Sequence, residues 1–475
     1  MHPSATQILW IADAYGFALA ALLVTMGGIG DRIGHKKLLL IGTVGFAAAS
    51  ALTASAPNAE MLIAARALLG VAGATLMPSA LSLIRQVFTE PKERTSAIGI
   101  FSAIGGLAVG LGPVLGGALL THFSWRAVFL INVPIMAVAF VAGLVLLPEA
   151  RGLRPGRLDL LSVPLSAVGV LGIVYGVKEA AQYGLAETHV VIPVIVGVAG
   201  LVLFPMRQAR VTEPLLDVSL FRRAAFTGSI TTNLFAMFAL VAQSLIFSQY
   251  FQLVLGWTPL TSGLAGLPAA LGSMVGGGVL APVLINALGR ARAVATGLIG
   301  AAAAYSLFLL AGVEPNYPLL LIPMILSGTA MGLALTITGD TVLAAVPKER
   351  TGAASAISET ATELGGALGM AVLGSILNAV YRNTLQPPTG LDVGARRAAG
   401  DSLGAAMQVA GQLPGRLAGQ LTAAAKGAFV NGMHLALLGS AAFAALVAVA
   451  ALVTLRHVPK VIPADDDREL ATASH

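Results

Sequence analysis

Apolar runs of about 20 residues recur along the whole chain, and they constrain its fold more than any other feature. Backbone N–H and C=O groups that cross hydrocarbon must bond to one another, so runs of this length are expected to be helices. The composition agrees, because 56% of the residues are hydrophobic and only 11% are charged. An ordinary soluble domain has about 25% charged residues. The sequence therefore predicts an all-α polytopic membrane protein.

We count 13 candidate spans, at 10–30, 38–56, 62–84, 96–119, 127–147, 159–177, 189–206, 227–249, 262–286, 293–312, 317–338, 352–378 and 431–455. The basic residues orient them. Twenty of the 28 Lys and Arg lie in alternate connections and the C-terminal tail, whereas the short connections between these hold only Arg126 and Lys178. Because short cytoplasmic loops are enriched in Lys and Arg, the C-terminus is expected in the cytoplasm.

Two short basic loops are repeated in phase. Pro-Lys-Glu-Arg-Thr occurs at Pro91–Thr95 and again at Pro347–Thr351, 256 residues later, while the Gly34–Lys37 loop is matched by Gly289–Arg292, 255 residues later. Parallel repeats in a membrane protein are typical of transporters whose two halves rock about a central site. The sequence thus predicts a duplicated architecture with a transport function.

The same shift leaves the span 227–249 without a partner in the first half. We therefore expect a complete design of 6 + 2 + 6 spans, of which one N-terminal span is absent from this chain. The predicted units are an N-terminal bundle (1–150), a two-span insert (151–223), the first five spans of a C-terminal bundle (224–378), an outer loop (379–430), the last span (431–458) and a cytoplasmic tail (459–475). Within the outer loop, 405–428 has helical periodicity, so an amphipathic hairpin or a disordered linker is expected there.

The first cytoplasmic loop combines glycines, an acid and bases in a way that topology alone does not require. Glycines let helix ends approach closely, and Asp31 can pair with a base or with the N–H groups at another helix's N-terminus. Such a contact can form in one rocking state and break in the other. We call this predicted contact the latch, with the residues Gly27, Gly30, Asp31, Arg32, Gly34 and Lys36; a plain topological loop is the alternative.

The loop resembles the signature loop of the major facilitator superfamily, with His35 in place of the usual Arg. Leu62-x-x-x-Arg66-x-x-x-Gly70 is similar to the fourth-span motif of that superfamily. Further matches, at 125–134 and 214–221, resemble its 14-span drug:proton antiporter branch, which includes quaternary-ammonium exporters. The resemblance implies a major facilitator fold, a bacterial cell membrane location, a monomer, and transport driven by the proton gradient.

Gly112, Pro113, Gly116 and Gly117 are similar to the superfamily's antiporter motif. Pro113 removes a backbone hydrogen bond and can kink the span that contains it. The glycines can equally serve close helix packing, and the two interpretations are compatible. We expect these residues to shape the path to the outside rather than to bind a ligand.

Two acids within one span carry the main functional prediction. Glu359 and Glu363 are four residues apart and share a helical face. A carboxylate near the bilayer midplane is costly when ionised, so it can hold a proton and release it when a cation enters. The resemblance supports this role, because acids of this span function in the quaternary-ammonium exporters. A structural ion pair with Arg66, or a partner in Thr362, is the alternative.

Arg66 and Asp13 are the other candidates for substrate or proton coupling. An unpaired Arg inside a span costs at least about 2.5 kcal/mol, so Arg66 needs a partner, a wet cavity or a snorkelling path. The resemblance implies a role in proton coupling. Asp13 lies at the outer end of its span and can instead be an exposed interfacial acid.

Several polar residues have plainer expectations. Asp340 is expected to be solvated or part of the latch, and Asn233 and Gln243 to line a cavity or to bond between helices. His434 is expected to be a satisfied core residue. There is no cysteine, no metal constellation, no nucleophile–base pair and no phosphate-binding loop in the sequence. We therefore expect no enzyme activity, no cofactor and no metal, and no nucleic-acid partner despite the net charge of +6.

The sequence predicts proton-coupled export of a hydrophobic, cationic compound, because the interior has several acids and a broad apolar lining. Export of a dedicated metabolite or siderophore by the same fold is one alternative. A transport-inactive membrane receptor or scaffold is another. The substrate itself is not specified by the fold.

Overall fold

The structure is a computed structural model that describes residues 5–148, 159, 161–183, 187–211, 214, 218–347 and 350–460. Helices and short connections make up these ranges, and no strand occurs in them. The all-α expectation is therefore confirmed. The predicted absent span, the basic loop at 151–157 and nearly all of the tail lie outside the described residues.

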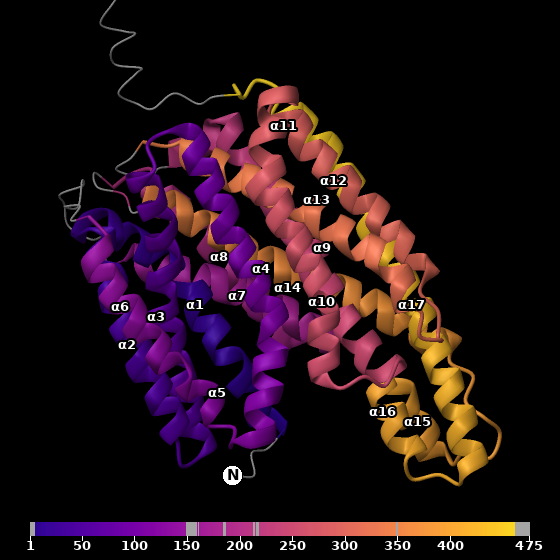
Figure 1. Cartoon of the computed structure of the whole chain (residues 1–475). Coiled ribbons are helices and arrows are strands. Elements are labelled where there is room, and N and C mark those ends of the chain that lie inside the picture. Colours follow the sequence, from indigo (N-terminus) through magenta and orange to yellow (C-terminus); the bar gives the residue numbers. More distant parts are fainter. Residues whose placement is uncertain are drawn as a thin grey trace, which may run out of the picture.

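We refer to the first six helices as the N-terminal bundle; in it α1 packs along α3 and α2 packs between α3 and α6 (Figure 1), whereas α4 packs mainly on α10 (Pro259–Met274) of the second half. A glycine with a positive φ of 96°, Gly34, separates α1 from α2. The side chain of Asn58 accepts a hydrogen bond from the N–H of Met61 and so starts α3. The helices are α1 (Ala5–Ile33), α2 (His35–Ser55), α3 (Ala59–Val87), α4 (Pro91–His122), α5 (Ala127–Leu130) and α6 (Asn132–Leu146).

Two helices link the bundles, α7 (Ser162–Tyr183) and α8 (Thr188–Gln208). Their backbones touch where glycines face each other, Gly172 against Gly197 and Gly169 against Gly200. At the basic side, Asp159 accepts two hydrogen bonds of 2.7 Å from Arg207. This bidentate pair joins the start of α7 to the end of α8, and α7 also packs on α1 and α14.

We expect the Asp159–Arg207 pair to stabilise the fold equally at about pH 5 and about pH 8. Its hydrogen bonds with Arg207 lower the pKa of Asp159 to about 2 from an ordinary value of 3.8. A depressed carboxyl pKa stabilises the fold above the ordinary pKa and loses that effect as the pH falls toward the lowered value. Asp159→Asn should therefore lower the thermal midpoint equally at about pH 5 and about pH 8. Arg207→Gln is the matched variant; a loss that grows between these pH values would contradict the assignment.

The C-terminal bundle repeats the order of the first. Gly289, 255 residues after Gly34, also has a positive φ, of 83°, and again separates two helices. The elements are η1 (Val218–Arg222), α9 (Ala224–Gln249), η2 (Tyr250–Val254), α10 (Pro259–Met274), η3 (Val275–Leu280), α11 (Ala281–Leu288), α12 (Arg290–Leu307), η4 (Phe308–Leu310), α13 (Tyr317–Ala344), α14 (Thr351–Thr384), α15 (Val393–Asp401), α16 (Leu403–Ala410) and α17 (Gly415–Thr454).

Within the described residues, 11 helices are long and apolar enough to cross a membrane. Two predicted spans are not among them: 96–119 lies within α4, and Ser162–Val177 of α7 is a shorter apolar helix. A helix covers each of the 13 predicted ranges, although the edges differ. The largest difference is at α17, which begins at Gly415 instead of near 431. Helices α7, α13 and α14 each continue six residues beyond the predicted ends.

The predicted outer loop consists largely of helices. Tyr381 of α14 is buried, and its hydroxyl donates to the carbonyl of Ala399 in α15. Leu403 and Ala406 of α16 are buried against the extended part of α17, including Leu421. These helices project below the bundle at the lower right of Figure 1. They therefore form a packed unit attached to the C-terminal bundle.

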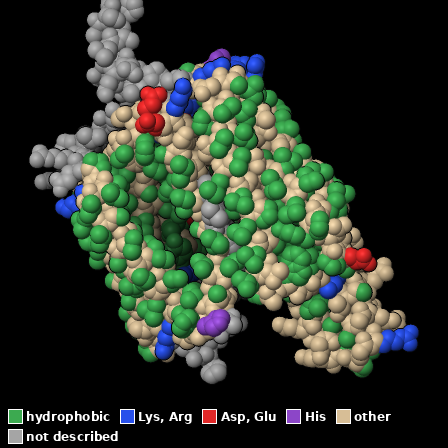
Figure 2. Space-filling view, in the orientation of Figure 1, with side chains coloured by type: hydrophobic (Ala, Val, Ile, Leu, Met, Phe, Trp, Pro, Cys, Tyr) green, Lys and Arg blue, Asp and Glu red, His purple; other side chains and the backbone are tan. Residues whose placement is uncertain are grey.

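The two bundles meet at one end and separate toward the other (Figure 2). Hydrophobic side chains cover the flanks, as a lipid-facing surface requires, and Lys and Arg gather at the upper rim. A notch opens at the bottom, beside the α15–α16 unit.

Candidate functional site

Asp31, at the end of α1, bonds to the first turn of α14 across the two bundles. Its carboxylate accepts hydrogen bonds from the backbone N–H groups of Gly352, at 2.8 Å, and Ala353, at 3.0 Å. Nε2 of His35 lies 3.0 Å from Oδ1, the same oxygen that accepts from Gly352. A helix N-terminus has unpaired N–H groups and a positive dipole end, so it stabilises an anion there. This is one of the two partners that the sequence predicted for Asp31.

Glycines make that contact possible. A Cβ on Gly27 would overlap the carbonyl oxygen of Gly352, and a Cβ on Gly352 would overlap that of Gly27. A Cβ on Gly30 would overlap the ring of His35. The backbones of α1 and α14 are therefore in direct contact, which brings Asp31 within reach of the N–H groups of α14.

For two residues of the predicted latch, the described hydrogen bonds lie within the N-terminal bundle. Lys36 donates to the carbonyls of Leu144, at 3.1 Å, and Leu147, at 2.7 Å, and so caps α6 within its own bundle. Arg32 donates to the carbonyl of Gly28 in its own helix. The described contacts thus place Asp31, Gly27 and Gly30 at the bundle interface, while Lys36 holds the N-terminal bundle together.

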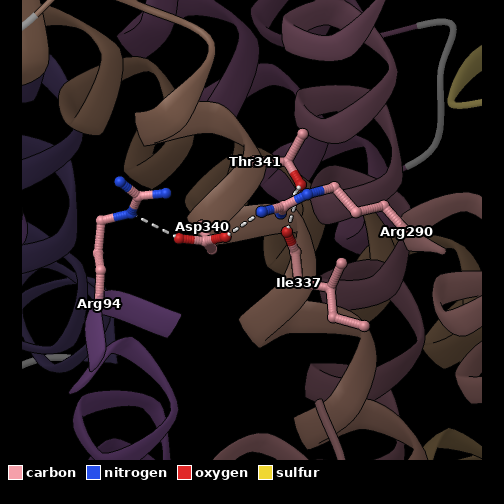
Figure 3. Close-up of polar contacts among 5 residues, drawn as sticks. All are labelled: Arg94, Arg290, Ile337, Asp340 and Thr341. Atoms are coloured by element: carbon pink, nitrogen blue, oxygen red, sulfur yellow. Dashed lines mark hydrogen bonds and ion pairs between the residues drawn. The ribbon is translucent and has the colours of Figure 1, made fainter. Parts of the chain in front are cut away.

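A buried ion triad forms the second contact between the bundles (Figure 3). Asp340 of α13 accepts a hydrogen bond of 2.8 Å from Nε of Arg94 in α4 and one of 2.7 Å from Nη2 of Arg290 in α12. Arg290 also donates to Oγ1 of Thr341, at 2.8 Å. The exposed fractions are 0% for Asp340, 2% for Arg290 and 5% for Arg94. Of the two expectations for Asp340, the solvated one is wrong, because two guanidinium groups enclose its carboxylate. The contact with Arg94 fits the other expectation, a part in the latch.

The repeat explains why there are two such contacts. The first basic loop, with Asp31 and His35, meets the helix that follows the second Pro-Lys-Glu-Arg-Thr sequence. In turn, the first such sequence supplies Arg94, which meets Arg290 of the second basic loop through Asp340. Each repeated loop therefore contacts the opposite bundle. The repeat was visible in the sequence, but the ionic partner of each loop was not.

The two membrane acids lie on α14 as predicted from their spacing. Glu359 and Glu363 are partly buried and interact electrostatically with each other. Glu363 also interacts electrostatically with Tyr15 of α1, which α3 flanks. It is 12 residues from the start of α14, or about 18 Å along the helix axis. The carboxylate therefore lies deep between the bundles.

Arg66 of α3 also contacts Tyr15. Its Nε donates to the carbonyl of Ile11, at 2.9 Å, and its guanidinium lies over the rings of Tyr15, at 5.3 Å, and Phe129, at 5.9 Å from the ring centroids. These cation–π contacts partly compensate a charge inside the bundle. Tyr15 interacts electrostatically with both Glu363 and Arg66, so all three lie in one region of the bundle interface. Phe129 falls in the match at 125–134, but nothing in the sequence paired Phe129 or Tyr15 with Arg66.

Other polar candidates bond between helices. Asn233 of α9 donates to Oγ1 of Thr362, at 2.9 Å, and Gln243 donates to Ser327, at 3.4 Å. His434 donates from Nε2 to the carbonyl of Ala311, at 2.8 Å, as expected of a satisfied histidine. Asp13 is partly buried on α1, between Ile11 and Tyr15.

The antiporter motif lies in the C-terminal half of α4. A Cβ on Gly112 or Gly116 would meet no atom within 4 Å, while one on Gly117 would meet Pro259 of α10 at 3.9 Å. Close packing at Gly112 and Gly116 is therefore not observed in the described part of this conformation. The helix continues through position 113, and the side chain of Pro113 lies outside the description. Nor do the described residues contain a His, Cys, Asp or Glu cluster suited to a metal.

The structure has two repeated helical bundles, with acids between them and ionic contacts between their ends. This arrangement is typical of membrane transporters whose bundles rock about a central site. The chain belongs to the Major Facilitator Superfamily, whose family model matches residues 1–370. This confirms the resemblance that the loop and span motifs indicated.

Several relatives align with nearly the whole chain. The multidrug efflux pump LfrA of Mycolicibacterium smegmatis is 43% identical over 91% of this chain and 85% of its own length. The methyl viologen resistance protein SmvA of Salmonella typhimurium is 33% identical, over 94% and 90%. The tetracenomycin C resistance and export protein of Streptomyces glaucescens is 32% identical, over 97% and 86%. The human organic anion transporter MFSD10 has a similar fold, with a TM-score of 0.56 at 16% identity, covering 92% and 83%.

Proposed function

We propose that this protein exports hydrophobic cationic compounds across a bacterial cell membrane in exchange for protons. In this proposal the bundles 1–150 and 224–378 rock about the acids of α14, and the insert 151–223 links them. The tail is cytoplasmic, the protein works as a monomer, and no cofactor takes part. The Asp31 contact and the Asp340 triad are the latches that close the cytoplasmic end.

The observation that carries the proposal is the position of Glu363. Its carboxylate lies about 18 Å along α14, beside Tyr15 and within the electrostatic field of Glu359. An ionised carboxylate is costly at that depth, and either a proton or a bound cation neutralises it. Competition between the two is the simplest chemistry that couples proton entry to cation exit. The names of LfrA and SmvA, a multidrug pump and a resistance protein for the dication methyl viologen, support this substrate class.

A second candidate function is export of one dedicated metabolite by the same mechanism. The relative that supports it is the tetracenomycin C resistance and export protein, which covers 97% of this chain. Such a substrate does not need to be cationic, so Glu363 would then bind protons only. The two candidates differ in whether an organic cation competes with protons.

The test is ethidium efflux from energised cells that express the protein. We expect extrusion that stops when a protonophore collapses the gradient, and that is lost in Glu363→Gln, because the amide cannot exchange a proton. The fall should be at least about a hundredfold, as for removal of a group used directly in turnover. Intracellular ethidium fluorescence is the measurement.

Glu314→Gln is the matched control, because Glu314 is an exposed acid in the connection before α13. Its efflux should equal that of the wild type. Ethidium retention by a wild-type protein that is present in the membrane would contradict cation export and favour the dedicated metabolite. Efflux that survives in Glu363→Gln would remove that carboxylate from the mechanism.

A further inference from the structure

The span that leads to the second basic loop is interrupted between α10 and α11. The interrupting segment is η3, Val275–Leu280, with the sequence Val-Gly-Gly-Gly-Val-Leu. After it, the N–H of Ala281 donates to the carbonyl of Gly276, five residues earlier instead of four. Such π-helical turns are rare and often occur at functional sites, and glycine has the lowest helix propensity of any residue except proline. The segment η3 is therefore easier to bend than a continuous α-helix.

The first half of the repeat has no such interruption at this position. The offset of 255 residues that relates the two basic loops places Ala21–Leu23 of α1 at the positions of Gly276–Gly278. Helix α1 is a single α-helix from Ala5 to Ile33. The repeated architecture therefore does not require the interruption, which is a particular property of the second half.

Close packing accounts for two of the three glycines of η3. A Cβ on Gly276 would overlap the carbonyl oxygen of Thr329 in α13, and a Cβ on Gly277 would overlap Oγ1 of Thr336. A Cβ on Gly278 would meet no atom within 4 Å. Since an alanine would fit at position 278, the property that the glycine adds there is conformational freedom.

The other π-helical segment of the described residues, η2, is fixed by its side chains. Tyr250, Phe251 and Val254 are all buried in the core of the C-terminal bundle. In contrast, η3 lies at the boundary between the bundles, because a Cβ on Gly99 of α4 would overlap the carbonyl oxygen of Gly277. A bend at η3 therefore changes how the second half meets α4.

The part of the span beyond η3 leads directly to the ion triad. It consists of α11, which has eight residues, and of Gly289, whose φ is 83°. The next residue is Arg290, which bonds to Asp340. Lys460 donates to the carbonyl of Asn286, at 2.8 Å, and so caps the end of α11. Helix α11 therefore lies between two glycine-containing turns, and polar contacts hold its cytoplasmic end.

We propose that Gly276–Gly278 is a hinge about which α11 swings when the Asp340 triad opens. The proposal rests on the rocking of the bundles argued above and adds a local step to it. The second half bends at η3, whereas α1 of the first half moves as one rigid helix. Because α11 packs on α4, α12 and α13, its movement away from α4 opens the cytoplasmic end between the bundles.

The test is a distance measured within the C-terminal bundle. The chain has no cysteine, so spin labels can be attached through Ala224→Cys on α9 and Ala287→Cys on α11, at two exposed positions. Rigid rocking leaves this distance unchanged, because both sites belong to one bundle. We expect two distances instead, one for each position of α11. Double electron–electron resonance on the reconstituted protein gives their populations, with and without ethidium and at acidic and neutral pH, since ligands shift such populations.

Gly278→Ala should reduce the population of the second distance about fivefold, the factor that corresponds to the difference in helix propensity between Gly and Ala. The distance for the closed position should stay the same, because the added Cβ meets no atom there. Gly266→Ala is the matched control, since Gly266 lies within α10 and also has open space at its Cβ position. Its distances and populations should equal those of the labelled wild type.

A pair of labels across the bundles, Lys92→Cys on α4 with Ala224→Cys, separates the hinge from the rocking; Lys92 is also exposed. Two distances for this pair, with one distance between Ala224 and Ala287, would overturn the hinge and leave the rocking intact. So would a second distance whose population is unchanged in Gly278→Ala. A single distance for both pairs under all conditions would overturn the rocking of the proposed function, and the hinge with it.

Discussion

Asp340→Ala is expected to destabilise the protein by about 3–5 kcal/mol, the usual cost of leaving buried charges without their partner. Asp340 is the acid between Arg94 and Arg290, and its removal leaves two guanidinium groups facing each other in a buried site. A change of that size is a large part of the total stability of a typical protein. The measurements are the amount of detergent-extracted, monodisperse protein and its thermal midpoint.

A triple variant separates the charge effect from a loss of packing. Asp340→Leu with Arg94→Met and Arg290→Met replaces the whole triad by apolar groups of similar length. It should recover most of the lost protein, because an apolar replacement removes the desolvation cost together with the attraction. Glu314→Ala, at an exposed site, should have no effect. If Asp340→Ala keeps the wild-type midpoint, the triad is not the contact that the structure shows.

Asp31→Asn is expected to reduce ethidium turnover by about tenfold or more, while equilibrium binding of ethidium stays near the wild-type value. An amide accepts through one oxygen only and has no charge, so it loses one of the two bonds to Gly352 and Ala353 and the attraction to the helix N-terminus. A hydrogen bond to a charged group contributes about 1.5–3 kcal/mol, which corresponds to about tenfold or more in rate. Transport by reconstituted protein and fluorescence titration give the two quantities.

Lys36→Met is the informative control for the latch. Lys36 belongs to the same sequence motif, but it caps α6 and makes no described contact with the C-terminal bundle. Its turnover should stay close to that of the wild type, with at most a lower thermal midpoint. Equal losses of binding and turnover in Asp31→Asn would argue against a role in switching between states.

Periodicity and composition were sufficient for the class of fold. A helix must satisfy its own backbone in hydrocarbon, so each apolar run specifies a helix without knowledge of its neighbours. The repeat of Gly34 at Gly289 likewise indicated two helix boundaries, since a backbone position with positive φ favours glycine. Both are local properties. The start of α17 was misplaced, because local pattern alone does not mark it. Residues 415–430 are only moderately apolar, but they continue the helix and pack against α16.

The candidate site was only partly predictable. The four-residue spacing of Glu359 and Glu363 placed both acids on one face, because helix geometry relates such positions directly. The helix N-terminus was a predicted partner for Asp31, but not which helix would provide it. The contacts of Tyr15 and Phe129 with Arg66 were not predictable, since an aromatic residue in an apolar span has the same pattern whether it packs in the core or covers a guanidinium.

What the sequence by itself determined is therefore the helices, their repeat and the faces on which the acids lie, since each follows from residues within about one turn or from an in-phase copy. Only the tertiary structure decided which charges meet. Arg94 and Asp340 are 246 residues apart, and Asp31 and Gly352 are 321 apart. At such separations the sequence does not say which groups will meet. For Asp31 the choice depends on the close approach of backbones that Gly27 and Gly352 permit.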